Sequence, residues 1–375
     1  MAGHFRASLA DPPAKSFPDR PQFSAFMKPC RFEGEVRNLE VVGTVPTELD
    51  GAFFRVMPDP QFPPFIENDP WFNGDGNVSA FRFHNGNVDF QQKYVRTEKF
   101  VREREANRAL AGAYRNKYTD AVEFKVRTTA NTNIFYFNKS LLAIKEDAPP
   151  YLMDPITLET KGLCDFDGQL PSCTFTAHPK LDPATGELVC FGYEAKGDGT
   201  PDVCYFSIAP DGKFLETVWL VAPVVGMIHD CAVTDNWWFR APNAFPGHTT
   251  NAYETPSGNI VFDLPLTDKN VFFWWPDAEG NAPDPHDIRA EYVRFEFDPR
   301  ATSDAALDLP APTPILRHDM EFPRIDERVL SKPHRHSFFD MMDPSLGTDF
   351  PAIMPIYGAC GGGEGAYEVE GWAAW

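Results

Sequence analysis

The alternation of apolar and polar residues along the chain predicts many short strands separated by turns. The first strand is predicted at Ala52–Val56. Val78–Phe83 and Val88–Tyr94 follow, and Asn85-Gly86 between them is a strong β-hairpin signal. Further strands are predicted at Asn133–Phe137, Leu141–Lys145, Glu187–Glu194, Val203–Ile208, Phe214–Val221, Cys231–Phe239, Asn259–Leu264 and Glu291–Phe297.

One stretch favours a helix. Glu98–Asn116 is rich in Arg, Glu, Ala and Leu and has no glycine before Gly112. The remaining pattern, strands at intervals of roughly 8–12 residues with turn residues between them, is typical of a sandwich, a barrel or a propeller. No WD or kelch repeat is visible, so the periodicity alone does not choose among these folds. The 375 residues suffice for two average domains or one large all-β domain.

Composition narrows the class of protein. The 36 prolines and 26 glycines favour turns over long helices. A net charge of −20 disfavours nucleic acid and an anionic membrane as partners. The seven cysteines form no Cys-x-x-Cys pair, and their odd number suits a reducing compartment. The first 18 residues contain no apolar signal region, and no run of 18 apolar residues occurs. A soluble cytoplasmic protein is expected.

Three histidines lie in short sequence segments whose neighbours restrict the backbone, as suits metal ligands. They are His178 before a proline, His229 after an apolar run, and His248 after a glycine. Three neutral imidazoles without a thiolate suit Fe, Cu, Zn or Ni and do not choose among them. No His-Glu-x-x-His, Gly-x-Ser-x-Gly, P-loop or Gly-x-Gly-x-x-Gly motif occurs. Ordinary surface or hydrogen-bonded core roles are expected for His4, His84, His286, His318, His334 and His336.

Five phrases together resemble the carotenoid cleavage oxygenase family, and they run in family order between about residues 38 and 337. The resemblance implies an all-β, seven-bladed β-propeller. It also implies four axial histidines that hold a non-haem Fe(2+), with O2 splitting an alkene into two carbonyl products. The phrases are Phe72-Asn73-Gly74-Asp75-Gly76, His178-Pro179-Lys180, His229-Asp230, His248–Glu254 and Glu321–Asp326.

The resemblance also implies roles for individual residues. His178, His229 and His248 match the first three iron ligands. Glu146 and Glu321 match carboxylates that orient ligand imidazoles by accepting from the second ring nitrogen.

The substrate is suggested by a second group of residues. Tyr114 and Lys145 resemble the pair that binds the phenol of the substrate in the lignostilbene and resveratrol cleaving members. Phe72 is a candidate to stack on a substrate ring. In an apolar carotenoid tunnel an unpaired Lys ammonium would cost several kcal/mol. A hydroxylated stilbene, cleaved by O2 at its central double bond into two aromatic aldehydes, is the expected substrate.

Two departures from the family pattern stand out. His229 and His248 are only 19 positions apart, so part of a blade is expected to be missing near residues 239–247. The tail at residues 346–375 resembles nothing in the family and offers no fourth histidine. An N-terminal arm at residues 1–29, an incomplete propeller at residues 30–345 and an atypical tail are therefore expected, with impaired activity.

Two alternatives to the stilbene dioxygenase stay open. One is an inactive propeller remnant that serves as a binding module, which iron content would distinguish from an enzyme. The other is a carotenoid or apocarotenoid cleavage dioxygenase, against which Tyr114 and Lys145 argue. The pattern fixes neither the preferred stilbene nor the oligomeric state.

Overall fold

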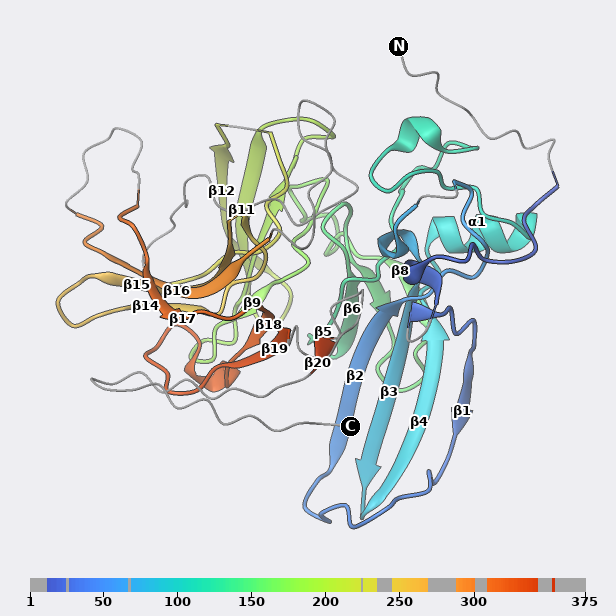
Figure 1. Ribbon diagram of the computed structural model, residues 1–375, viewed down its shortest axis with the longest axis horizontal. Helices are drawn as coiled ribbons and strands as arrows, with labels where there is room; N and C mark the ends of the chain where they lie inside the picture. The colour runs from blue at the N-terminus through green and yellow to red at the C-terminus, as the bar shows by residue number, and fades with distance from the viewer. Residues whose placement is uncertain are drawn as a thin grey trace. The chain divides into compact units, whose positions relative to one another are not determined.

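The structure is a computed structural model that describes residues 12–24, 27–66, 69–223, 225–234, 245–268, 288–300, 309–342 and 353–354. Antiparallel sheets dominate these residues (Figure 1). The chain divides into two compact units. The first comprises Met1–Ala177 and Cys190–Gly226, and the second comprises His178–Val189 and Met227–Trp375.

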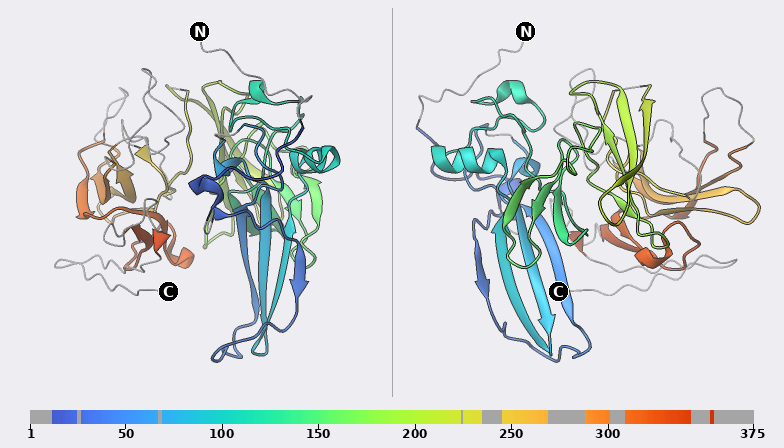
Figure 2. Two further views of the ribbon diagram at one scale, coloured as in Figure 1. Left: turned by 45° about the vertical axis from the view of Figure 1, so that its right-hand side comes forward. Right: turned by 180° about the vertical axis from the view of Figure 1, so that it is seen from behind.

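The first sheet of the first unit contains the predicted hairpin. Asn85 (φ 49°) and Gly86 (φ 76°) are both left-handed, as a two-residue type I′ turn requires. The long blue-to-cyan strands of this sheet lie side by side in both views of Figure 2. In spatial order the strands are β1 (Gly34–Val36), β4 (Asn87–Tyr94), β3 (Gly76–His84) and β2 (Gly51–Pro58).

The second sheet of this unit is a simple meander. Its first turn again uses two left-handed residues, Asn138 and Lys139. Residues of this sheet and of β3 share one buried apolar cluster that includes Val78, Leu141 and Met153. Burial of these side chains holds the two sheets together. The strands are β5 (Asn133–Phe137), β6 (Ser140–Ile144), β7 (Tyr151–Met153) and β8 (Thr160–Leu163).

A third sheet has every residue of its strand β10 buried. The outer strand β12 leaves seven of its eight residues exposed. The sheet order is β12 (Phe214–Val221), β11 (Asp202–Ile208), β10 (Leu188–Tyr193) and β9 (Lys180–Leu181). The short pair formed by β9 with Leu188–Val189 belongs to the second unit.

The predicted helix is shorter than expected. Helix α1 spans Glu98–Ala106 rather than continuing to residue 116. Thr97 caps its N-terminus by accepting from the Phe100 N–H, and Asn107 ends the helix in the left-handed conformation. The remaining helical segments are 3-10 turns at η1 (Pro21–Phe23), η3 (Trp71–Asn73), η4 (Lys117–Thr119) and η6 (Glu327–Val329).

The second unit contains two further sheets with small apolar clusters, one of Leu264, Val293 and Phe295 and one around Tyr292. The larger sheet consists of β13 (Phe245–Pro246), β15 (Ile260–Thr267), β16 (Ala290–Phe297) and β17 (Thr313–Leu316), with β14 (Asn251–Glu254) also paired to β15. The smaller sheet consists of β18 (Met320–Arg324), β19 (Phe338–Met342) and β20 (Ile353–Met354).

The strand predicted at Cys231–Phe239 is wrong where it can be compared, because residues 231–234 are not in a strand. The rest of that stretch, residues 235–239, lies outside the described residues. The physical reason is local: the Cys231 N–H donates to Asp230, and the Cys231 carbonyl accepts from Thr249. These backbone groups are therefore used by side chains instead of by a neighbouring strand.

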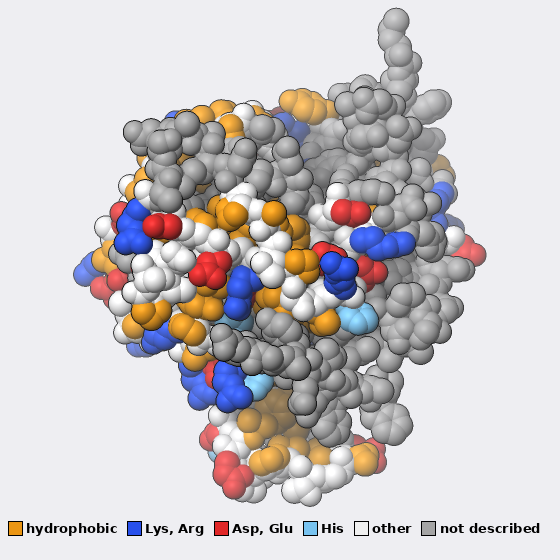
Figure 3. Space-filling model, turned by 60° about the vertical axis from the view of Figure 1, so that its left-hand side comes forward, with side chains coloured by type: hydrophobic (Ala, Val, Ile, Leu, Met, Phe, Trp, Pro, Cys, Tyr) orange, Lys and Arg blue, Asp and Glu red, His pale blue; other side chains and the backbone are white. Residues whose placement is uncertain are grey.

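The all-β prediction is confirmed for the described residues. In the sheets β5–β8, β9–β12 and β18–β20 successive strands are neighbours, as in the blades of propellers. In the described part of the chain, no helix is long and apolar enough to cross a membrane. On the face in Figure 3, acidic and basic side chains are interspersed, with apolar side chains between them.

Candidate metal centre and aromatic cluster

Three imidazoles converge in the second unit. His178 lies just before β9, His229 lies in the strandless segment 225–234, and His248 lies between β13 and β14. The Nε2 atom of His229 is 3.0 Å from Nε2 of His178 and 3.1 Å from Nε2 of His248. The rings meet edge to face at 72–89°. One nitrogen of each ring therefore approaches the same point, as ligands of a single metal ion do.

The protonation state of His178 suits a ligand. Burial lowers the pKa of His178 well below its usual value, and the nearby Asp230 carboxylate only partly opposes this effect. The ring is therefore neutral at pH 7, as metal binding requires. Three imidazoles held together fit Fe(II), although the same donors also suit Cu, Zn and Ni.

Glu321 of β18 orients His248. Its Oε2 lies 2.8 Å from the ring Nδ1, and its Oε1 accepts from the His248 backbone N–H at 3.2 Å. The carboxylate fixes the tautomer that leaves Nε2 free of a proton. A Cβ on Gly247 would collide with Glu321 Oε1, so glycine is needed beside His248 for this approach. Glu321 thus lies where an imidazole-orienting carboxylate is expected.

Phe72, Tyr114 and Lys145 come together in the first unit, although they are far apart in the sequence. The Lys145 Nζ lies 4.6 Å from the centre of the Tyr114 ring, and the Phe72 ring centre lies 6.0 Å from it. The ammonium donates to Thr129 Oγ1 at 2.8 Å and to the Phe72 carbonyl at 3.1 Å. The Lys145 ammonium and the Tyr114 phenol therefore place two polar groups within an otherwise aromatic cluster.

Burial sets the ionisation of both groups. It lowers the pKa of Lys145 to about 8, against the attraction of Asp147. It raises the pKa of Tyr114 far above its usual value, and the negative charge of Glu146 adds to the effect. At pH 7 Lys145 is therefore a charged donor and Tyr114 a neutral hydroxyl.

Arg115 is a residue that sequence reasoning missed. Its Nη1 lies 3.5 Å from Glu146 Oε1 and its Nη2 lies 2.7 Å from Glu194 Oε2, and its guanidinium lies over the Tyr193 ring. It is left-handed at φ 55°, a conformation that residues other than glycine seldom adopt. Its position directly after Tyr114 was the only signal in the sequence.

The predicted approach of Glu146 to a ligand histidine stays a prediction, because Glu146 belongs to the first unit and the histidines belong to the second. The same holds for the expectation that Tyr114 and Lys145 face the metal.

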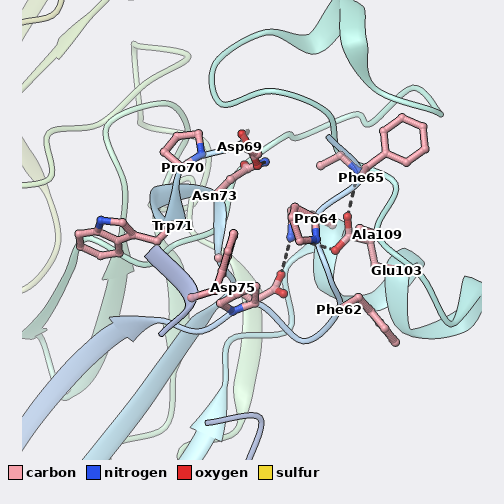
Figure 4. A pocket seen from close by; sticks show the side chains of 15 residues that line it. Phe62, Pro64, Phe65, Asp69, Pro70, Trp71, Asn73, Asp75, Glu103 and Ala109 are labelled. Carbon is pink, nitrogen blue, oxygen red and sulfur yellow. Dashed lines mark hydrogen bonds and ion pairs between the residues drawn. The ribbon is translucent and has the colours of Figure 1, made fainter. Parts of the chain in front are cut away.

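Residues of the segment around Asn73 line a pocket next to this aromatic cluster (Figure 4). Asp69 accepts from Asn73 Nδ2 at 2.6 Å and from the Tyr114 backbone N–H at 2.8 Å. Burial raises the pKa of Asp69 to about 6, against these two hydrogen bonds. Asp75 and Glu103 each lie 2.9 Å from the buried Lys99 Nζ. The acidic and amide residues of the pocket therefore hold the Tyr114 segment and α1.

Known proteins resemble this chain over most of its length. Residues 27–238 and 237–357 match the family described as "Retinal pigment epithelial membrane protein". The two matched segments overlap at residues 237–238.

Two curated relatives are similar over most of both chains. Resveratrol cleavage oxygenase 1 of Aspergillus fumigatus is 58% identical over 91% of this chain and 77% of its own length. Carotenoid cleavage oxygenase 1 of Neurospora crassa is 52% identical over 92% of this chain and 74% of its own length. The crystal structure of Pseudomonas brassicacearum lignostilbene dioxygenase is 39% identical, covers 92% of this chain and 82% of that chain, and has a TM-score of 0.85.

Proposed function

The chain belongs to the Retinal pigment epithelial membrane protein family, and from that premise we propose that it is a non-haem Fe(II) dioxygenase of hydroxylated stilbenes. It cleaves the central double bond with O2 and releases two aromatic aldehydes. The observation that carries the proposal is the juxtaposition of Lys145 and Tyr114, which provides a phenol-binding end. The 58% identity to a resveratrol cleavage oxygenase supports it.

The metal would be held by His178, His229 and His248, whose ligand atoms lie within 4.8 Å of one another. Bound Fe(II) supplies the centre at which O2 is activated. Glu321 keeps His248 in the tautomer and orientation that a metal needs. We assign Glu146 the same task on a second imidazole, and the ion pair with Arg115 keeps its carboxylate in place.

The substrate would bind through its phenol. The Lys145 ammonium donates to the phenol oxygen and favours the phenolate, while the Tyr114 hydroxyl donates to the same oxygen. A phenolate pushes electron density through the ring to the central alkene, which makes that bond more reactive towards O2. Phe72, stacked on Trp71 at 4.2 Å, provides a rigid face for the substrate ring.

Three broader assignments complete the proposal. A seven-bladed propeller is supported by the TM-score of 0.85 to the lignostilbene dioxygenase. A cytoplasmic location is supported by six free cysteines among the described residues. The lower activity expected from the short link between His229 and His248 stays a prediction.

A carotenoid or apocarotenoid substrate is the second candidate, favoured by the 52% identity to a carotenoid cleavage oxygenase. Fe(II)-loaded protein should be assayed with a 4-hydroxystilbene, its 4-methoxy analogue and an apocarotenoid. The proposal predicts aldehyde release from the free phenol and much less from the other two. Equal turnover of the phenol and its methyl ether would contradict the phenolate mechanism, and turnover of the apocarotenoid alone would establish the second candidate.

A further inference from the structure

One buried carboxylate connects all three segments that carry the histidines. Asp230 directly follows His229. Its Oδ1 accepts from the Nζ of Lys180, two residues after His178, at 2.8 Å. Its Oδ2 accepts from the backbone N–H of Thr249, directly after His248, at 2.8 Å. The three segments therefore meet at one side chain.

The Asp230 carboxylate is fully used by these bonds. Oδ1 also accepts from the Cys231 N–H at 2.7 Å, and the Thr249 Oγ1 lies 2.9 Å from Oδ2. A carboxylate offers about four acceptor positions, and three N–H donors occupy three of them, while the single proton of the Thr249 hydroxyl is shared between Oδ2 and the Cys231 carbonyl. Only 3% of the side chain is exposed. A buried charge is tolerated when it is paired in this way, and it then holds its neighbours in fixed positions.

We propose that Asp230 is a positioning residue that presets the spacing of His178, His229 and His248 before metal binds. The Nε2 atom of His229 lies 3.0 and 3.1 Å from the Nε2 atoms of the other two rings, and their lone pairs repel one another unless a proton or a metal lies between them, so a frame must hold them there. Asp230 supplies this frame because it follows His229 directly and binds the Lys180 side chain of the His178 segment and the Thr249 backbone N–H of the His248 segment. The inference rests on the proposed metal site and adds the residue that organises it.

Asp230→Asn tests the proposal, since the amide keeps the size of the side chain. It replaces one acceptor oxygen with an NH2 group, which must face either the donors from Lys180 and Cys231 or those from Thr249. We expect Co(II) affinity, measured by calorimetry on metal-free protein, to fall at least tenfold. The absorption bands of bound Co(II) should also change as the ligand geometry loosens.

Asp263→Asn is the matched control. Asp263 is an equally buried carboxylate of the same unit, and it pairs with Arg294 at 2.7 and 2.8 Å. Both variants should lower the melting temperature of the metal-free protein, but only Asp230→Asn should weaken Co(II) binding. An equal loss of affinity in the two variants, or no loss in Asp230→Asn, would overturn the proposal.

Thr249 provides a milder pair if Asp230→Asn fails to fold. Thr249→Val removes the hydroxyl that bonds to Asp230 and Cys231, whereas Thr249→Ser keeps it. We expect Co(II) affinity to fall several-fold in the valine variant and to be retained in the serine variant; equal affinity in the two would contradict the proposal.

The proposed function can fail separately from this inference. If wild-type protein binds no Co(II), or binds it equally well after His229→Ala, the metal site itself is wrong and the inference fails with it. If wild type binds Co(II), His229→Ala does not, and the Asp230 and Thr249 variants bind Co(II) as tightly as wild type, this inference alone is wrong.

Discussion

The carboxylate of Glu321 lies 2.8 Å from the Nδ1 atom of His248. Because this nitrogen donates to the carboxylate, the Nε2 atom is the one directed towards His229 with its lone pair available. One strand residue of β18 thus sets the tautomer of a side chain that is 73 positions earlier in the chain. The relationship connects the phrase around Glu321 to the metal centre.

Glu321→Gln is expected to reduce Fe(II) affinity by about 10–100-fold, as loss of an imidazole-orienting carboxylate does in other metal sites. Anaerobic titration of metal-free protein with Fe(II) measures this effect. Glu327→Gln, in the nearby turn η6, is the control and should bind Fe(II) like wild type. Unchanged affinity in Glu321→Gln would show that the carboxylate does not tune the metal.

His229→Ala is expected to abolish stoichiometric iron binding, because Nε2 of His229 lies within 3.1 Å of both other imidazoles and its removal leaves two of the three that meet among the described residues. Iron content after loading and desalting measures the loss. His334→Ala is a matched control, since His334 is a half-buried histidine of the same unit that bonds to Ser337 and Asn251. Equal iron content in the two variants would contradict the assigned ligand set.

The pH dependence of turnover should report Lys145. With its pKa lowered to about 8, Lys145 is protonated below that pH and becomes a neutral amine above it. Since a charged donor favours the phenolate, kcat/KM for a 4-hydroxystilbene should fall as pH rises above about 8. Lys145→Arg, whose guanidinium remains charged, should lose this decline. A decline of the same shape in the arginine variant would assign it to another group.

Lys99→Met should destabilise the protein by about 3–5 kcal/mol, because it leaves the buried carboxylates of Asp75 and Glu103 without their cation. Urea unfolding followed by fluorescence measures the change. Lys117→Met, which removes an exposed ion pair with Asp198, should cost less than about 1 kcal/mol. A similar loss of unfolding free energy in the two variants would mean that the buried carboxylates do not depend on Lys99.

Local signals predicted the hairpins well and the helix end poorly. Asn85-Gly86 and the turn that begins at Asn138 use residues that readily adopt the left-handed conformation, so the flanking strands follow directly. The helix α1 ends at Ala106 because Asn107 is left-handed, and Glu103 of the helix then accepts from the backbone N–H groups of Leu110 and Ala111, which holds that segment as a loop. Helix propensity has no access to such a contact.

At the metal centre, too, some residues could be predicted from the sequence and others only from the fold. His178, His229 and His248 could be chosen because their phrases are distinctive, and the structure brings the three together. The frame around them is less visible in the sequence, since Asp230 acts through Lys180 and Thr249 from segments 50 and 19 residues away. Arg115 was missed for a similar reason, because its partners Glu146 and Glu194 meet it only in the fold.

The most direct test of the central claim is the product analysis of Fe(II)-loaded protein incubated with resveratrol under 18O2. The account predicts two aromatic aldehydes in equal amounts, both labelled with 18O, and loss of both products in the His229→Ala variant. Iron-loaded protein that releases no aldehyde from resveratrol, or that releases the same amount after His229→Ala, would contradict it.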